Sequence, residues 1–199
     1  AYKINLKNRK EWKLFDSQYL DYFCLTKIKN MSIINSLEWR YATKKFDPSK
    51  KLSKEKIDIL KKAFNLTATS FGLQPIKMIV LSNKEIQEKF VEISYYQRQV
   101  ADASHLLVFC IESDTTSNDI NNYFDFEIKT RGIEEDVISK FRSQLIDMYE
   151  NKSLDEKQLS AKYQTYIALG NLMTVCAVEE IDSCPMEGFN PEKVDKLLN

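Results

Sequence analysis

Apolar residues recur along this chain in two patterns, helical spacing and short continuous runs. Apolar positions three and four residues apart predict helices in four segments: after Ser32, after Ser53, at 120–128 and at 134–150. Two apolar runs of strand length lie between the helices, at Ile76–Leu81 and Leu106–Ile111. Because the second run is apolar throughout, we expect it to be covered on both faces. Helices around two or more buried strands predict an α+β layer structure.

Residues that cap helices mark several of the expected helix starts. Ser53 stands before one helix, and Ser-x-x-Glu capping boxes begin at Ser82 and at Ser153. Asn190 followed by Pro191 predicts one more start, with asparagine as the cap and proline in the first turn. A loop is expected over 182–189, before this last helix.

The helix that begins after Ser153 is long and becomes apolar on more than one face in its second half. Such a helix is typically central in a domain or lies in a subunit interface. Gly170 lies inside it, where glycine costs about 1 kcal/mol relative to alanine. A close approach by a neighbouring helix would explain this glycine, so we expect one there.

Composition narrows the classes of function. The 199 residues suit one domain, or one domain with an appendage, and 29 basic residues balance 29 acidic ones. The zero net charge argues against a nucleic-acid-binding protein, and no apolar run reaches the roughly 20 residues of a membrane span. The four glycines form neither a GxGxxG motif nor a P-loop, so a Rossmann-type nucleotide site is not expected.

Cysteine and histidine offer little chemistry of their own. No CxxC spacing occurs among the four cysteines, which are Cys24, Cys110, Cys176 and Cys184. Buried reduced thiols fit this pattern, and they fit a cytoplasmic protein. The single histidine, His105, begins a strand, and we interpret it as structural rather than catalytic. No metal site is expected.

The first 30 residues differ from the rest of the chain. They hold seven basic residues against three acidic ones and few apolar residues, Trp12 among them. Met31, which follows, looks like the natural first residue of the domain. We interpret residues 1–30 as an extension that is not native to the domain, with an arm that packs on the domain as the alternative. A nucleic-acid-binding role for this basic stretch has no motif to support it.

Four segments in register carry a resemblance to a known family. They are WRYATKKFD at 39–47, TSFGLQP at 69–75, QRQVADASH at 97–105 and DSCPMEGF at 182–189. In their order and spacing they resemble the FMN-dependent nitroreductase family, in the branch of oxygen-insensitive NAD(P)H nitroreductases and dihydropteridine reductases. The resemblance covers residues 31–199. It implies a central, mostly antiparallel sheet flanked by helices, and an obligate homodimer with active sites at the interface.

The first segment would bind the charged parts of the flavin. The resemblance places Arg40 at the phosphate or ribityl end and Lys44 near the pyrimidine edge of the ring, where a cation would stabilise the reduced, anionic flavin. Tyr41 and Ala42 occupy neighbouring contact positions. If this stretch is helical, Arg40 and Lys44 share one side of a turn. The alternative is a solvated helix face that pairs with Glu38 and Asp47.

The resemblance assigns the remaining flavin contacts to three segments. The 182–189 loop would form the wall under the ring through Pro185, Met186, Glu187 and Gly188, with the last two N–H groups near flavin N5. The other subunit would contribute Thr69, Ser70 and Gly72. Gln99 matches a position near the ribityl chain. Each segment alone could also be an ordinary turn or loop.

Aromatic residues are candidates for an acceptor pocket. Tyr123 and Phe124 could line it, although packing in the core of a helix is the alternative for both. Tyr96 is a third candidate. The family often has asparagine at the position of Tyr96 and proline at that of Arg98, so this chain departs from the pattern there.

The implied reaction is a ping-pong hydride transfer. NAD(P)H would reduce the flavin at N5, and a nitroaromatic, quinone or similar acceptor would then be reduced, with no side chain assigned as a catalytic acid. One alternative is a dehydratase, dehalogenase or flavin-processing relative on the same fold. Another is a degenerate, non-catalytic FMN-binding protein. Family members continue past Asn199 with a strand and basic residues for the FMN phosphate, so we expect residues 1–199 to bind FMN less tightly than a longer relative.

Overall fold

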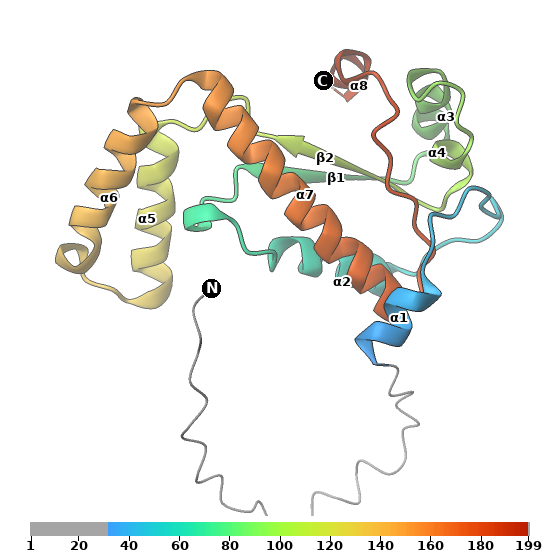
Figure 1. The fold of residues 1–199 in the computed structure, drawn as a ribbon, viewed down its shortest axis with the longest axis horizontal. Helices are drawn as coiled ribbons and strands as arrows, with labels where there is room; N and C mark the ends of the chain where they lie inside the picture. Colours follow the sequence, from blue (N-terminus) through green and yellow to red (C-terminus); the bar gives the residue numbers. More distant parts are fainter. Residues whose placement is uncertain (1–31, 199) are drawn as a thin grey trace, which may run out of the picture. The chain divides into compact units, whose positions relative to one another are not determined.

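A computed structural model describes residues 32–198, so the interpretation of residues 1–30 lies outside the described part of the chain. The element order in Figure 1 is α1 (Ile33–Trp39), α2 (Lys54–Asn65), η2 (Ser70–Gly72), β1 (Ile76–Leu81), α3 (Lys84–Ile93), α4 (Gln99–Asp102), β2 (Leu106–Ile111), α5 (Ser117–Arg131), α6 (Glu135–Glu150), α7 (Leu154–Val178) and α8 (Pro191–Leu198). The expected α+β architecture is confirmed, with both strands at their predicted positions.

The two strands form an antiparallel sheet that helices cover unequally. Ile76 pairs with Ile111 and Leu81 with Leu106. Alternate residues of both strands pack against α2 and α7, whereas α3 and α8 contact the opposite face only around Leu81, Leu106 and Val108. All six residues of β2 are therefore half-buried, so the expected cover is present on both faces but incomplete.

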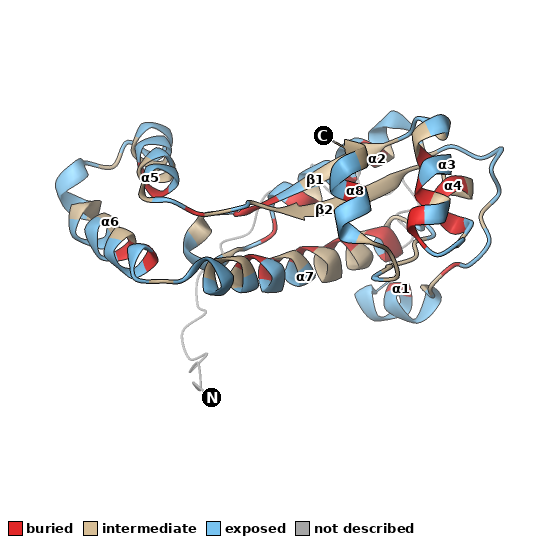
Figure 2. Cartoon of the chain, turned by 90° about the horizontal axis from the view of Figure 1, so that it is seen from above, coloured by how far each residue is buried: buried red, intermediate tan, exposed pale blue. Residues whose placement is uncertain are grey.

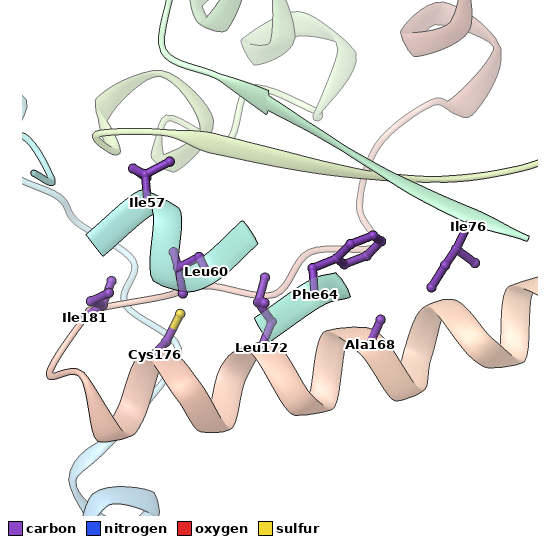
Figure 3. Close-up of a cluster of buried hydrophobic side chains, with 8 residues drawn as sticks. All are labelled: Ile57, Leu60, Phe64, Ile76, Ala168, Leu172, Cys176 and Ile181. Atoms are coloured by element: carbon purple, nitrogen blue, oxygen red, sulfur yellow. The ribbon is translucent and has the colours of Figure 1, made fainter. Parts of the chain in front are cut away.

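The main core lies between the sheet and the α2–α7 layer. Ser53 caps α2 as predicted, its side chain accepting the Lys56 N–H. The buried side chains of α2 then meet those of α7 and the start of β1 (Figure 3): Ile57, Leu60, Phe64, Ile76, Ala168, Leu172, Cys176 and Ile181. Burial of these residues explains why α2 and α7 keep helical spacing of apolar positions.

Two smaller clusters complete the described fold. Phe90, Ile93 and Val100 from α3 and α4 meet Val194 of α8, which brings the end of the chain to α3. The α5–α6 pair has its own cluster of Ile120, Phe124, Leu145 and Tyr149. Figure 2 shows α5 and α6 at the opposite end of the sheet from α3, α4 and α8.

The caps confirm two predicted helix starts and correct a third. Ser153 and Glu156 form the capping box of α7, and the Asn190 side chain accepts the Lys193 N–H at 3.0 Å. The start of α3 is different, because Asn83 and not Ser82 is the cap, accepting the N–H of Ile86. Asparagine one residue later offers an equally good acceptor, so the Ser-x-x-Glu pattern misplaced this start by one residue.

Helix α7 is central, one of the two positions that its apolar faces predicted, but one detail differs. A Cβ built on Gly170 would meet nothing within 4 Å, so the expected close helix approach is absent within residues 32–198. Along the same helix, six large apolar side chains remain exposed: Leu154, Leu159, Tyr163, Tyr166, Ile167 and Val178. None of the helices described by the structure is long and apolar enough to span a membrane.

Candidate functional site

The 40–44 segment is extended and not helical. Helix α1 ends at Trp39, and Arg40 is its C-cap with φ −73° and ψ 143°. Ala42 then forms an isolated parallel bridge with Ser183. The hypothesis that Arg40 and Lys44 share a helical turn is therefore wrong. Alternation along an extended strand still puts residues 40, 42 and 44 on the same side of the segment.

Three contacts join this segment to the 182–184 loop. The Thr43 N–H donates to the Ser183 carbonyl at 3.2 Å, and the Thr43 hydroxyl donates to Asp182 Oδ1 at 3.1 Å. Lys44 Nζ lies 3.6 Å from Cys184 Sγ. Two of the four recognisable segments, far apart in sequence, are thus side by side.

A chain of two glutamines links the third segment to the same loop. Gln99 Nε2 donates to Gln97 Oε1, and Gln97 Nε2 donates to the Gly188 carbonyl, both at 3.1 Å. A Cβ on Gly188 would lie 2.8 Å from Gln97 Nε2, so the loop approaches this closely because residue 188 is glycine. Gln97 had no predicted role, and the only signal for it was its place inside the recognisable 97–105 segment.

Several donors in this region have no protein acceptor within residues 32–198. Arg40 Nε is buried and unpaired. The backbone N–H groups of Glu187 and Gly188 make no hydrogen bond to the described chain. Neither Arg40 nor Lys44 forms an ion pair with Glu38 or Asp47 there, so the solvated-face alternative lacks its expected partners. Buried polar groups without partners are uncommon and point to a missing acceptor.

The wall residues differ in their surroundings. Met186 is half-buried and packs against the α3–α8 cluster, and Pro185 is also half-buried. Glu187 is exposed, and its carboxylate accepts a hydrogen bond from the Tyr166 hydroxyl of α7 at 2.7 Å. Sequence reasoning gave Tyr166 no role in the site, because nothing in its local pattern connects it with residue 187.

The remaining recognisable segment, at 69–72, is held away from the 182–188 loop. Its Ser70 N–H donates to Gln164 Oε1 of α7 at 2.9 Å. Gln164 and Tyr166 are two residues apart, or about 200° around a helix with 3.6 residues per turn. Thr69, Ser70 and Gly72 are therefore held on another side of α7 than the 185–188 wall, beside the start of β1 (Figure 1).

The aromatic candidates fall in two places. Tyr96 is 77% exposed with φ 60°, immediately before Gln97. Tyr123 packs over Gly72, where a Cβ would lie 2.5 Å from the Tyr123 hydroxyl. Phe124 is 1% exposed in the α5–α6 cluster, as the core-packing alternative predicted.

His105 has the surroundings of a structural residue. Its Nδ1 lies 2.8 Å from the hydroxyl of the neighbouring Ser104. Burial lowers the pKa of His105, and the positive charges of Lys51, Lys84 and Lys61 lower it further. The imidazole is therefore neutral at pH 7 and is not poised to donate a proton.

Comparisons with known proteins agree with these motifs. A model of the nitroreductase family matches residues 37–199. A Staphylococcus epidermidis relative named "putative NAD(P)H nitroreductase" is 36% identical over 176 residues, which are 85% of this chain and 79% of the relative.

Two solved structures have the same fold. A Staphylococcus epidermidis structure described as a "putative NAD(P)H:FMN oxidoreductase" has a TM-score of 0.75 at 19% identity, covering 84% of this chain and 79% of its own. An Exiguobacterium sibiricum "putative nitroreductase in complex with FMN" has a TM-score of 0.73 at 20% identity, covering 84% and 80%.

Proposed function

Because this chain belongs to the nitroreductase family, we propose that it is an FMN-dependent oxidoreductase that uses NAD(P)H to reduce nitroaromatics, quinones or similar small acceptors. One observation carries the proposal. The bridge between Ala42 and Ser183 brings Arg40 and Lys44 beside the 182–188 loop, and neither Arg40 Nε nor the N–H groups of Glu187 and Gly188 have an acceptor within residues 32–198. Relatives named for NAD(P)H and a neighbour bound to FMN support the choice of cofactors.

The residues present fit FMN. The unpaired Nε of Arg40 suits an anionic acceptor such as the phosphate, which a guanidinium binds with charge-assisted hydrogen bonds. Lys44 is exposed beside the wall loop and suits the pyrimidine edge. The two free N–H groups of Glu187 and Gly188 suit the N5 region, with Tyr41, Ala42 and Gln99 as neighbouring contacts.

The protein's part in the reaction is to bind, orient and stabilise charge. Bound FMN supplies two-electron hydride chemistry at N5, between NAD(P)H and the acceptor. Lys44 stabilises the negative charge that reduction puts on the pyrimidine side of the ring. Pro185 and Met186 would give apolar cover to the bound ring. The exposed Tyr96 and the half-buried Tyr123 are the aromatic candidates for contacts with that acceptor.

A second copy of the chain completes this site. Besides the exposed apolar residues of α7, helix α1 exposes a second apolar group, Ile33, Ile34 and Leu37. We infer that the exposed apolar surface of α7, together with the exposed group on α1, contacts a partner subunit. A two-fold contact through this surface brings the partner's 69–72 segment to the flavin, which this chain's own 69–72 segment does not border.

An absorption experiment tests the proposed function. We expect the purified protein, loaded with FMN, to show the yellow flavin spectrum and to bleach when NADPH or NADH is added without oxygen. Menadione or a nitroaromatic compound should then restore the colour. Protein that binds FMN but does not bleach would favour the non-catalytic alternative, and protein that stays colourless would contradict flavin binding altogether.

A further inference from the structure

Tyr166 of α7 makes the single described hydrogen bond to the carboxylate of Glu187, in the 182–188 loop. The Tyr166 hydroxyl donates to Glu187 Oε1 at 2.7 Å. Within residues 32–198 this carboxylate has no ion-pair partner and no second donor. Tyr166 and Glu187 therefore form an isolated pair at the loop that presents the two free N–H groups.

The loop is held at two adjacent residues. Gln97 Nε2 binds the Gly188 carbonyl at 3.1 Å, and Tyr166 binds the Glu187 side chain. The Phe189 N–H also donates back to the Glu187 carbonyl at 3.0 Å, which closes a tight turn. Gln97 and Tyr166, both outside the loop, thus bind the two residues whose N–H groups have no acceptor within residues 32–198.

The Tyr166–Glu187 pair also affects the negative charge beside the proposed flavin ring. A carboxylate near the flavin disfavours the reduced, anionic form, since like charges repel. A hydroxyl that donates to the carboxylate draws part of this negative charge toward itself. The hydrogen bond to Glu187 and the charge of that carboxylate raise the pKa of Tyr166 above its ordinary value. Tyr166 therefore keeps its proton, and so stays a donor, throughout the neutral pH range.

We propose that Tyr166 is a positioning residue of the flavin site, whose hydroxyl fixes Glu187 and compensates the charge of its carboxylate beside the ring. This inference rests on the proposed function. Tyr166 touches neither substrate nor cofactor in this account and acts through Glu187. Its hydroxyl favours reduced FMN over oxidised FMN, so its loss lowers the reduction potential of the bound flavin.

The test compares Tyr166→Phe with a matched control in the FMN-loaded protein. The control is Tyr149→Phe, because Tyr149 lies in the α5–α6 cluster, away from the 182–188 loop, and its hydroxyl has no described hydrogen bond. We expect Tyr166→Phe to weaken binding of reduced FMN, relative to oxidised FMN, by about threefold to tenfold. For a two-electron couple this corresponds to a potential lower by about 15 to 30 mV, measured by dye-coupled spectroelectrochemistry. Tyr149→Phe should leave the potential unchanged.

The Glu187→Gln background separates charge compensation from a structural effect. Glu187→Gln removes the charge, so it should raise the potential, and adding Tyr166→Phe to it should produce no further fall. A purely structural loss would weaken both redox forms equally and leave the potential unchanged, which would overturn the inference. A fall in potential that persists in the Glu187→Gln background would also overturn it. If the wild-type protein binds no FMN, the proposed function fails first, visible as a missing flavin spectrum, and the inference fails with it.

Discussion

Replacing Leu172 with alanine is expected to lower the free energy of unfolding by about 2 to 5 kcal/mol. Leu172 is 3% exposed and points from α7 toward Leu60 and Phe64 of α2 (Figure 3). The smaller side chain loses burial and leaves a cavity, since the rigid α2–α7 layer collapses only in part. Urea unfolding of both proteins measures the loss, at one fixed protein concentration because a dimer's stability depends on concentration.

Leu66→Ala is the control for this substitution. Leu66 follows α2 and is 72% exposed, so the same chemical change should alter stability by less than about 0.5 kcal/mol. If Leu172→Ala cost no more than Leu66→Ala, with the same denaturant dependence, the α2–α7 layer would not be the main core.

Replacing Arg40 with alanine is expected to weaken FMN binding by about 10-fold to 100-fold. A hydrogen bond to a charged group contributes about 1.5 to 3 kcal/mol, and each 1.4 kcal/mol is a factor of ten in affinity. Arg40 is the candidate for this contact because its Nε is buried without a partner in the described chain. Quenching of FMN fluorescence on titration with protein measures both dissociation constants.

Arg131→Ala provides the matched control for Arg40. Arg131 lies at the end of α5 and pairs with Glu127 at 3.0 Å, so its loss should leave FMN affinity unchanged. The salt dependence gives a second check, because screening should weaken FMN binding by wild-type protein more than by Arg40→Ala. Equal affinities for wild type and Arg40→Ala would remove Arg40 from the site.

Local patterns in the sequence were sufficient to predict most of the helices and both strands. Both strands and the long α7 helix follow from runs and spacing of apolar residues, and the cap at Ser153 follows from its capping box. The end of α1 could not be found in this way. No glycine or proline directly follows Trp39, and only the structure, through the extended backbone of Arg40 and the bridge of Ala42 to Ser183, shows where the helix ends.

The assembly of the site depends on contacts that local patterns do not encode. Motif resemblance gave Arg40, Lys44 and Gly188 as separate candidates. Thr43 and Asp182, which bind each other, are 139 residues apart, so no periodicity could predict their contact. The bond between Tyr166 and Glu187 likewise joins an exposed helix face to a loop. The apolar faces of α7 did indicate from the sequence a helix that is central or lies in a subunit interface, and the interface role stays a prediction.

Native mass spectrometry of the FMN-loaded protein tests the central claim most directly, because it reports subunits and ligands together. The account holds that two chains assemble and that each assembly carries two equivalent flavin sites. It predicts one main species of twice the 23.3 kDa chain mass, with two FMN molecules bound. A monomer with stoichiometric FMN, or a dimer that carries none, would contradict it.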